Sequence, residues 1–174
     1  MAILPIVHYP EPVLLTVGKP VGEDEFGEEL TRYVEDMFAT MADAHGVGLA
    51  APQVGLSKRL FVMDTPETDE RARERHVLIN PEIIHVEGEQ NGDEGCLSFP
   101  GLYQTVRREM RVIARAQNIK GEQVEIDVQD LAARCILHET DHCDGIVFLD
   151  RMTPLKRQFA KRKIKTLQKT GKWN

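Results

Sequence analysis

The sequence predicts an α+β fold, with antiparallel strands and interspersed helices, and three observations support this prediction. Apolar and polar residues alternate over residues 110–116 and again over 124–128, with Gly121 between the two runs. This pattern is typical of a β-hairpin with one buried face. Residues 28–44 and 130–143 instead carry apolar side chains at helical spacing. Locally paired strands with helices between them indicate the α+β class, and 174 residues suffice for a single domain, residues 1–174, with its own core.

The first half of the chain contains one predicted helix, a loop and a strand. The helix at 28–44 is expected to end before Gly46, because glycine terminates helices. The segment GVGLAAPQVG, residues 46–55, is too rich in glycine to be expected as regular structure. Residues 59–64 (RLFVMD) form a predicted strand, and the polar residues 66–75 a predicted exposed loop.

The second half contains strands, the hairpin and two helices. Residues 77–79 and 83–86 are predicted strands, interrupted at the Asn-Pro pair 80–81. In the helix that follows the hairpin, Asp130 is a candidate N-cap. A basic C-terminal helix is predicted at about residues 154–170.

Charge is distributed unevenly along the chain. The net charge is -6, yet residues 151–174 hold nine Lys or Arg and no Asp or Glu. Two interpretations remain: a solvated helix whose lysines add solubility, or an electrostatic contact for a polyanion such as RNA. Under the second, four apolar residues would anchor the helix on the body: Leu155, Phe159, Ile164 and Leu167. Removing residues beyond about Lys161 is expected to leave a catalytic site intact, because no candidate site residue lies there.

The composition favours a cytoplasmic protein that does not enter a membrane. No stretch approaches the roughly 20 apolar residues that span a bilayer. The start, MAILPIVHYPEPVLL, lacks a basic residue and contains prolines, so it is a poor secretory signal. Three cysteines, an odd number, argue for reduced thiols or metal ligands instead of a disulfide framework.

A candidate metal site lies in the second predicted helix, where residues 138–142 match H-E-x-x-H. His138 and His142 are four residues apart, so both imidazoles lie on one helix face and can grip one ion. Glu139 is placed to take a proton from water at that ion. The motif also occurs by chance on exposed helices, but Ile136 and Leu137 before it indicate a buried one.

A catalytic metal usually has three protein ligands and one open position, and three cysteines compete for the third place. Cys135 shares the face of His138 but lies about 10.5 Å along the helix axis from His142, at 1.5 Å per residue. Cys143 points about 100° away from its neighbour His142. Cys96 is on a distant segment and can approach from the open side, so elimination favours Cys96.

Three motifs now indicate a family. Residues 46–53 (GVGLAAPQ) resemble G-x-G-x-A-A-x-Q, residues 94–98 (EGCLS) match E-G-C-x-S, and residues 138–142 (HETDH) match H-E-x-D-H. In this order and spacing they resemble the peptide deformylases, and the N-terminal segment YPEPVLLTVGKPV is also similar to that family. The resemblance implies an α+β fold with antiparallel sheets around a central metal-bearing helix. It also implies hydrolysis of the N-formyl group of N-formylmethionyl nascent polypeptides, with release of formate.

The resemblance also implies roles for individual residues. Cys96, His138 and His142 match the metal ligands, and Glu139 matches the general base and acid. The metal is expected to be Fe²⁺ in the cell, and Zn²⁺, Ni²⁺ or Co²⁺ can occupy the same site. Glu94 and Asp141, which neighbour the ligands, are candidates for orienting the histidines.

Further roles concern the substrate. Gln53 matches a side-chain donor to the formyl oxygen, the Leu97 N–H joins it, and the Gly48 backbone holds the formyl group. Motif position and helix phase favour three residues for an apolar methionine pocket: Val47, Leu131 and Cys135. Tyr103 stands where some members carry an arginine near the substrate backbone, which makes it a further substrate-binding candidate.

Two alternatives belong to other classes. A general H-E-x-x-H metalloprotease would explain residues 138–142 but not EGCLS or the glycine-rich segment with its glutamine. An inactive ribosome-associated binding protein would be expected to have lost a ligand or the base, and this sequence retains all four residues.

Overall fold

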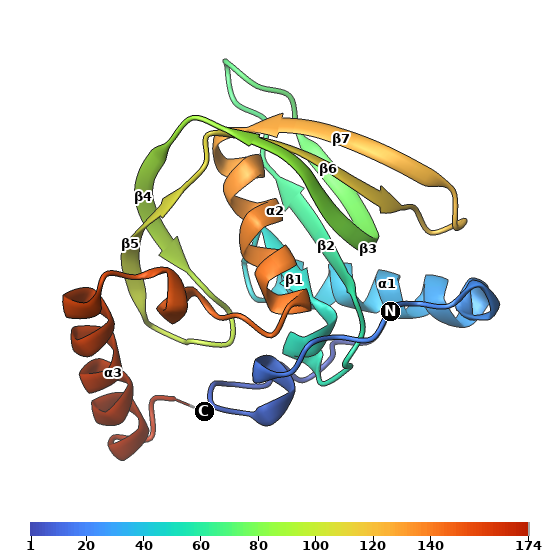
Figure 1. Ribbon diagram of the computed structural model, residues 1–174. Helices are drawn as coiled ribbons and strands as arrows, with labels where there is room; N and C mark the ends of the chain where they lie inside the picture. The colour runs from blue at the N-terminus through green and yellow to red at the C-terminus, as the bar shows by residue number, and fades with distance from the viewer. Residues whose placement is uncertain (174) are drawn as a thin grey trace.

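Three α-helices and seven β-strands make up the regular structure of the described residues, 1–173, in a computed structural model of the chain (Figure 1). The helices are α1 (Glu28–Asp43), α2 (Asp130–Cys143) and α3 (Pro154–Lys169). The strands are β1 (Gly48–Ala50), β2 (Leu60–Thr65), β3 (Glu74–Glu87), β4 (Gln90–Gly95), β5 (Tyr103–Arg108), β6 (Arg111–Gln117) and β7 (Gln123–Gln129). Four short 3₁₀ turns complete the order: η1 (Pro12–Leu15), η2 (Glu23–Glu25), η3 (Ala51–Val54) and η4 (Phe148–Arg151).

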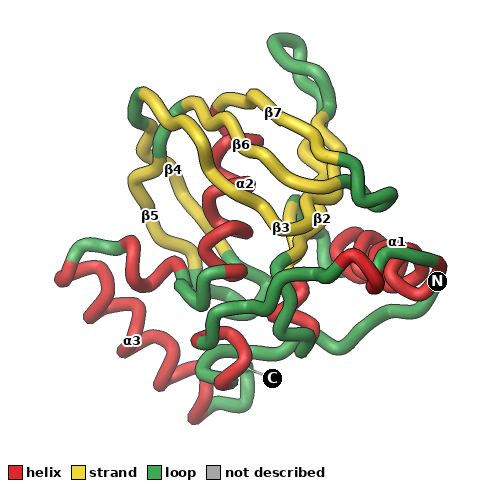
Figure 2. The backbone as a smooth tube through the Cα atoms, turned by 45° about the vertical axis from the view of Figure 1, so that its right-hand side comes forward, coloured by secondary structure: helices red, strands yellow, loops and turns green. Residues whose placement is uncertain are grey.

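All strand pairs are antiparallel and form two sheets. One sheet has five strands in the order β1-β2-β3-β6-β7, and the other pairs β4 with β5. Figures 1 and 2 show α2 between the two sheets, as the central element of the molecule. The α+β class and the central helix predicted from the sequence are confirmed, as is the hairpin of β6 and β7.

The first four residues of β2, Leu60–Met63, are all apolar because both faces of the strand are buried there. Phe61 and Met63 pack in the cluster that includes α2 residues, whereas Leu60 and Val62 pack in the cluster that includes Met37 of α1. A strand covered on both faces lacks the alternation of a half-exposed strand. Because β2 is packed between these two clusters, its neighbour in the sheet, β1, is held beside α2.

Two segments are more regular than predicted. The glycine-rich segment 46–55 contains β1 and η3, because pairing with β2 orders β1 despite its composition. Strand β3 runs through the Asn-Pro pair as one element with a register shift between Ile79 and Glu82. Asn80 has a φ of 51°, and its side chain exchanges hydrogen bonds with the backbone of Val21 at 2.8 and 2.9 Å. The predicted interruption is therefore a bulge.

The predicted N-cap of α2 is wrong. Gln129 precedes the helix, no side chain caps it, and Asp130 has a φ of 54°. The Asp130 carboxylate pairs with Arg71 of the loop between β2 and β3. This ion pair links the loop to the start of α2.

Helix α3 lies within the predicted range and begins after Thr153, whose side chain accepts a hydrogen bond from Lys156 N at 3.4 Å. The four apolar residues predicted to pack this helix against the body do so only in part. Ile164 is buried, whereas Leu155 and Phe159 are 62% and 54% exposed. Ala160, the residue after Phe159, is buried, so Leu155 and Phe159 lie together on the solvent-facing side of the helix.

The chain after α3 returns to the body. Trp173 is buried, packs edge-on against Phe99 at 5.9 Å between ring centroids, and donates a hydrogen bond from Nε1 to Tyr9 O at 2.7 Å. Trp173, the last residue described, is therefore part of the core that holds the N-terminal segment. No helix in residues 1–173 is long and apolar enough to cross a membrane.

Candidate metal centre and active site

Cys96, His138 and His142 form a group that could hold a metal ion. Their candidate ligand atoms all lie within 4.8 Å of one another, and Cys96 Sγ is 3.3 Å from His142 Nε2. The two histidines project from one face of α2, with ring centroids 4.9 Å apart. Cys96 follows the end of β4, where a turn closed by Phe99 N and Cys96 O (2.9 Å) directs this segment toward α2. One thiol and two buried imidazoles suit a borderline first-row divalent ion with a fourth position left for water or substrate.

The other two cysteines lie outside this group. Cys135 Sγ is 3.5 Å from Val47 O, and burial raises the pKa of this thiol well above its ordinary value. Cys143 packs in the core beneath the five-stranded sheet, and burial raises its pKa to about 12. Both thiols are therefore held in the neutral form, which is a poor metal ligand.

Glu94 on β4 contacts the outer nitrogen of His138. Its Oε2 is 2.7 Å from His138 Nδ1, so the opposite nitrogen, Nε2, is left for a metal. Burial alone would raise the pKa of Glu94, but the hydrogen bonds from His138 and Arg108 outweigh it and hold this pKa well below its usual range. The expectation that Glu94 orients a histidine agrees with this contact.

The Asp141 carboxylate forms no hydrogen bond with either histidine within residues 1–173, contrary to the sequence-based expectation. Its carboxylate accepts hydrogen bonds from Arg108 Nη1 at 2.8 Å and from Arg151 Nε and Nη2 at 3.0 and 2.8 Å. Arg108 also donates to Glu94 from Nε and Nη2, at 3.0 and 2.8 Å. Within residues 1–173 the hydrogen bonds of the Asp141 carboxylate therefore connect it to Glu94 through Arg108.

Three arginines of this network were missed in the sequence: Arg108, Arg134 and Arg151. Arg134 donates from Nη1 to Glu94 Oε1 at 3.0 Å and to Val106 O at 2.8 Å. Helix phase could have found it, because Arg134 precedes His138 by four residues and so shares its face. No local pattern marks Arg108 or Arg151, since their partners are distant in the chain.

Glu139 is a buried carboxylate beside the metal group. Within residues 1–173 its Oε2 has no hydrogen-bond partner. Burial raises the pKa of Glu139 to about 7, and a bound cation would act in the opposite direction. An unpaired buried carboxylate is costly to stability, so its presence next to three potential ligands indicates a chemical role.

Gly48 of β1 leaves the space that Glu139 occupies. A Cβ at Gly48 would lie 2.6 Å from Glu139 Oε1 and 2.7 Å from Cys135 Sγ, closer than real Cβ atoms approach other atoms. Only glycine lets β1 pass this close to α2. The close packing of β1 against the H-E-x-D-H helix therefore requires a glycine in the first motif.

Gln53 lies on η3, behind Cys96. Its Oε1 accepts a hydrogen bond from Ala50 N at 2.9 Å, which fixes the amide orientation. Its Nε2 points toward Ser98 Oγ at 3.3 Å and Cys96 Sγ at 3.5 Å. The side chain is buried, and its donor faces the metal group.

A cavity of about 340 Å³ opens in front of the metal group. Cys96, His138 and Glu139 form part of its wall. Six further residues predicted to contact or polarise the substrate also line it: Val47, Gly48, Leu97, Tyr103, Leu131 and Cys135. Two other candidates, Gln53 and His142, are not among its lining residues.

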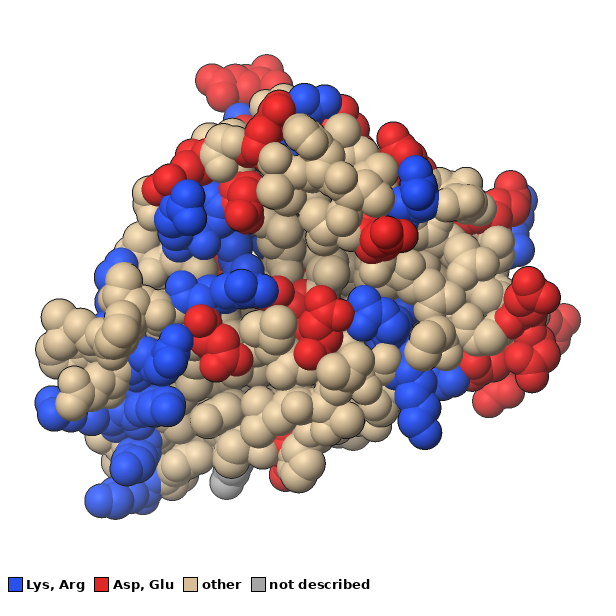
Figure 3. Space-filling model, in the orientation of Figure 1, with Lys and Arg blue, Asp and Glu red and all other residues tan. Residues whose placement is uncertain are grey.

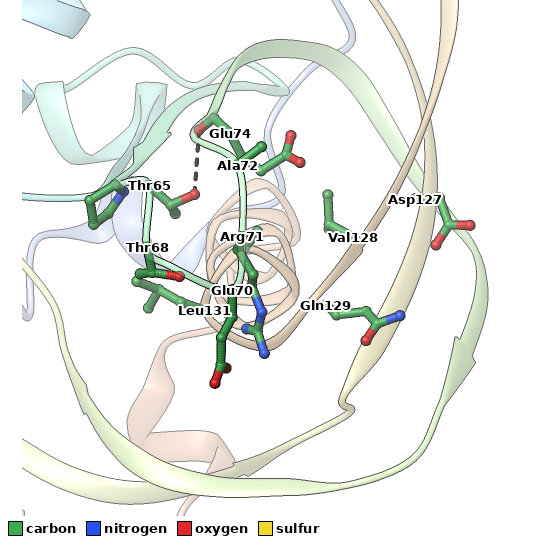
Figure 4. Close-up of a pocket in the computed structure, with 12 residues that line it drawn as sticks. Thr65, Thr68, Glu70, Arg71, Ala72, Glu74, Asp127, Val128, Gln129 and Leu131 are labelled. Atoms are coloured by element: carbon green, nitrogen blue, oxygen red, sulfur yellow. Dashed lines mark hydrogen bonds between the residues drawn. The ribbon is translucent and has the colours of Figure 1, made fainter.

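A second cavity, of about 350 Å³, lies between the loop after β2 and the start of α2 (Figure 4). It contains none of the three candidate metal ligands, and Leu131 lines both cavities. The loop closes on itself where Thr65 Oγ1 contacts Glu74 O at 3.5 Å. This loop is therefore a neighbour of the first cavity, separated from it by Leu131.

An α+β frame around an H-E-x-x-H helix, with a thiol brought in from a strand end and a buried carboxylate beside it, defines a metal-dependent hydrolase. Comparison with known proteins narrows this class. Residues 3–158 match the family model described as polypeptide deformylase. A peptide deformylase of Acidobacterium capsulatum is 50% identical over 173 residues, which cover 99% of this chain and 100% of the relative. One from Chromobacterium violaceum is 46% identical over 169 residues, covering 97% and 98% of the two chains.

Solved structures of peptide deformylases are also similar to this chain. A peptide deformylase from Legionella pneumophila is similar with a TM-score of 0.86 at 42% identity, over 98% of both chains. One from Ehrlichia chaffeensis in complex with actinonin has a TM-score of 0.87 at 36% identity, over 95% of this chain and 98% of the other. The chain belongs to the polypeptide deformylase family. It is a hydrolase that acts on a linear amide and removes the N-formyl group from nascent polypeptides.

Proposed function

We propose that Cys96, His138 and His142 hold one divalent metal ion and that the cavity in front of them binds the formylmethionyl end of the substrate. The observation that carries this proposal is the convergence of these three side chains within 4.8 Å beside the buried Glu139. When bound, such an ion lowers the pKa of water and polarises a carbonyl group.

Glu139 is the proposed general base and acid. It takes a proton from the attacking water and passes it to the amine nitrogen that leaves when the C–N bond of the formamide breaks. Its burial and its unpaired Oε2 support this role, because the proton can move without competition from another protein acceptor. Gly48 keeps the carboxylate close to β1 and to the reacting group.

Negative charge develops on the formyl oxygen during attack, and two donors are proposed to stabilise it. Gln53 offers Nε2 from behind Cys96, and Leu97 offers its backbone N–H. Within residues 1–173 the Leu97 N–H makes no backbone hydrogen bond, so it is available to a ligand. Preorganised donors of this kind form an oxyanion hole. The backbone of Gly48 is the proposed holder of the formyl group.

The methionine side chain is proposed to bind among Val47, Leu131 and Cys135. Val47 and Leu131 are 36% and 44% exposed, which leaves apolar surface at the cavity for a ligand to cover. Tyr103 lies over Gly95 at the cavity mouth and is 70% exposed. We propose that it contacts a residue that follows the methionine.

Formate release tests these roles. Protein purified without oxygen, with its metal content measured, should release formate from a formyl-Met peptide and leave the internal bonds of an unformylated peptide intact. Cleavage of internal peptide bonds at a comparable rate would instead support a general metalloprotease. Substrate turnover without any bound metal would contradict the proposed ligand set.

We also propose Fe²⁺ as the metal in the cell, with Zn²⁺, Ni²⁺ or Co²⁺ able to replace it. A set of two imidazoles and one thiolate suits several first-row ions, and a thiolate next to an open iron position is sensitive to oxidation. Activity should decay in air for the iron form and persist for the Ni²⁺ and Co²⁺ forms. Equal decay of all three forms would point to another cause than iron oxidation.

Ribosomal RNA is the proposed partner of α3. Figure 3 shows Lys and Arg gathered over this helix, whereas acidic residues spread over other parts of the visible face. The exposed basic residues on α3 include Lys161, Arg162, Lys165 and Lys169. Because these charges lie on the face away from the body, they can meet a polyanion without moving the helix.

Deleting the helix would not separate a loss of ribosome binding from a loss of stability, because Ile164 and Trp173 are part of the core. Replacing Lys161, Arg162, Lys165 and Lys169 by Gln should weaken ribosome binding and leave hydrolysis of a short formyl peptide unchanged. The matched control replaces four exposed basic residues elsewhere by Gln: Arg32, Arg107, Arg115 and Lys120. Binding by the unaltered chain should fall steeply with salt. If both variants bind ribosomes equally well, the basic residues of α3 would serve solubility alone.

The whole chain, residues 1–174, is proposed to act as one catalytic domain in the cytoplasm. Support for one domain comes from a core cluster that joins Leu14, Phe99, Phe148 and Trp173, from both ends of the chain. Three free cysteines fit a reducing compartment. Cell fractionation with activity measured in each fraction tests the location.

A further inference from the structure

A chain of ion pairs leads from the candidate metal centre to the protein surface. It begins at His138, whose Nδ1 is 2.7 Å from Glu94, and continues through Arg108 to Asp141. Each of these four residues is at most 8% exposed. The chain ends at Arg151, whose side chain is 46% exposed. This outer arginine has no role in the proposed reaction.

Arg151 is well placed to hold the buried part of the chain. It lies at the end of η4, after the turn that follows α2, and its guanidinium grips both oxygens of Asp141 at 2.8 and 3.0 Å. Paired, nearly parallel hydrogen bonds of this kind fix the carboxylate in two directions. Asp141 is then held in the position from which it accepts Arg108 Nη1.

Charge balance makes the outer pair necessary. Arg108 is 5% exposed and divides its donors between Glu94 and Asp141. Without Arg151, Asp141 would keep one cationic partner and gain freedom to turn toward the solvent at the neighbouring cavity of about 500 Å³. Breaking one member of a buried ionic network leaves the remaining charges poorly compensated. Arg108 would follow Asp141, and the orientation of Glu94 would loosen.

We infer that Arg151 is a positioning residue for the metal centre. It acts through Asp141 and Arg108, which fix the carboxylate that orients His138. The inference rests on the proposed role of His138 as a metal ligand. It also explains why an aspartate that faces away from the metal stands inside the H-E-x-D-H motif.

Metal release tests this inference without relying on turnover. Ni²⁺-loaded protein is mixed with an excess of a colorimetric chelator, and the release rate is measured at a temperature where every variant is folded. Direct partners of metal-bound histidines typically change metal affinity by about 10–100-fold. Because Arg151 acts three contacts further out than Glu94, Arg151→Gln should speed release by about 3–10-fold, a reduced share of that effect. Arg151→Lys keeps the charge but loses the paired hydrogen bonds, so its rate should lie between those of the unaltered chain and Arg151→Gln.

Arg111 supplies the matched control. It also makes paired hydrogen bonds to one carboxylate, Asp127, at 2.8 and 2.7 Å, and its side chain is 32% exposed. Its only other carboxylate partner within residues 1–173 is Glu87, which lies outside the network around His138. Arg111→Gln should leave the release rate unchanged, and the melting temperature of each metal-free variant separates general destabilisation from positioning.

Two results would overturn the inference. One is a release rate for Arg151→Gln that equals that of the unaltered chain, whatever its melting temperature. The other is an equal acceleration by Arg111→Gln, which would mean that any lost surface pair has this effect. Formate release by the unaltered protein is measured alongside, so failure of the proposed function would be seen separately.

Discussion

Gly48 and Glu139 are fitted to each other across β1 and α2: a Cβ on Gly48 would lie 2.6 Å from Glu139 Oε1. The contact joins the first glycine-rich motif to the H-E-x-D-H helix, which are about ninety residues apart in the sequence. A glycine is therefore needed at position 48 for steric reasons, independently of any contact between its backbone and the substrate.

The first prediction concerns this contact. Gly48→Ala should displace the Glu139 carboxylate and the Cys135 side chain, because one of the atoms must move by several tenths of an ångström or more. Misplacement of a reacting group by about 1 Å can cost about 10²-fold in rate. We expect kcat/KM for a formyl peptide to fall by about that factor while the metal content stays constant. Gly27→Ala is the control, because nothing lies within 4 Å of the added methyl group.

The second prediction concerns Glu139 itself. Glu139→Gln should retain the metal, because the three proposed ligands remain, and should lose most turnover, because the base is gone. General acid–base catalysis typically contributes about 10²–10⁴-fold, so kcat should fall within that range. Metal analysis and formate release on the same sample check the result. A parallel loss of metal and rate would assign Glu139 a structural role.

The third prediction concerns Gln53. Replacing it by Ala should lower kcat/KM by about 10²–10³-fold, the usual cost of one oxyanion donor. Because Oε1 also accepts the Ala50 N–H, some loss of stability should accompany it. Gln53→Glu retains an acceptor for Ala50 but no donor, so it should lose activity with a smaller change in melting temperature. A nearly unchanged rate for both variants would mean that another group serves the formyl oxygen.

Local periodicity explains what could be predicted from the sequence. Helices α1 and α2 and the β6–β7 hairpin have regular apolar spacing, and the four-residue separation of His138 and His142 follows from the helix alone. Cys96 was selected because Cys135 lies too far along the helix from His142, and the structure brings Cys96 to both histidines.

Long-range pairing explains what was missed. Strand β4 (QNGDEG) is polar and glycine-rich, and only its register with β5 makes it a strand. Strand β1 exists because it pairs with β2, which is buried on both faces. The network of Arg108, Asp141 and Arg151 joins β5, α2 and η4, so no local pattern could reveal it.

The last prediction concerns the end of the chain, whose removal beyond about Lys161 the sequence predicts to leave the catalytic site intact. Trp173 is 4% exposed, contacts Phe99 and donates to Tyr9 O, so it closes the core over the N-terminal segment. Truncating a buried tryptophan to alanine typically costs about 3–5 kcal/mol, a large share of the stability of an ordinary domain. Trp173→Ala should therefore lower the midpoint of denaturant unfolding substantially, whereas Lys172→Ala, at an exposed neighbour, should leave it unchanged. Truncation after Lys161 removes both Ile164 and Trp173, and we expect it to lower stability and activity together. Equal midpoints for Trp173→Ala and the unaltered chain would show that the C-terminal segment does not stabilise the fold.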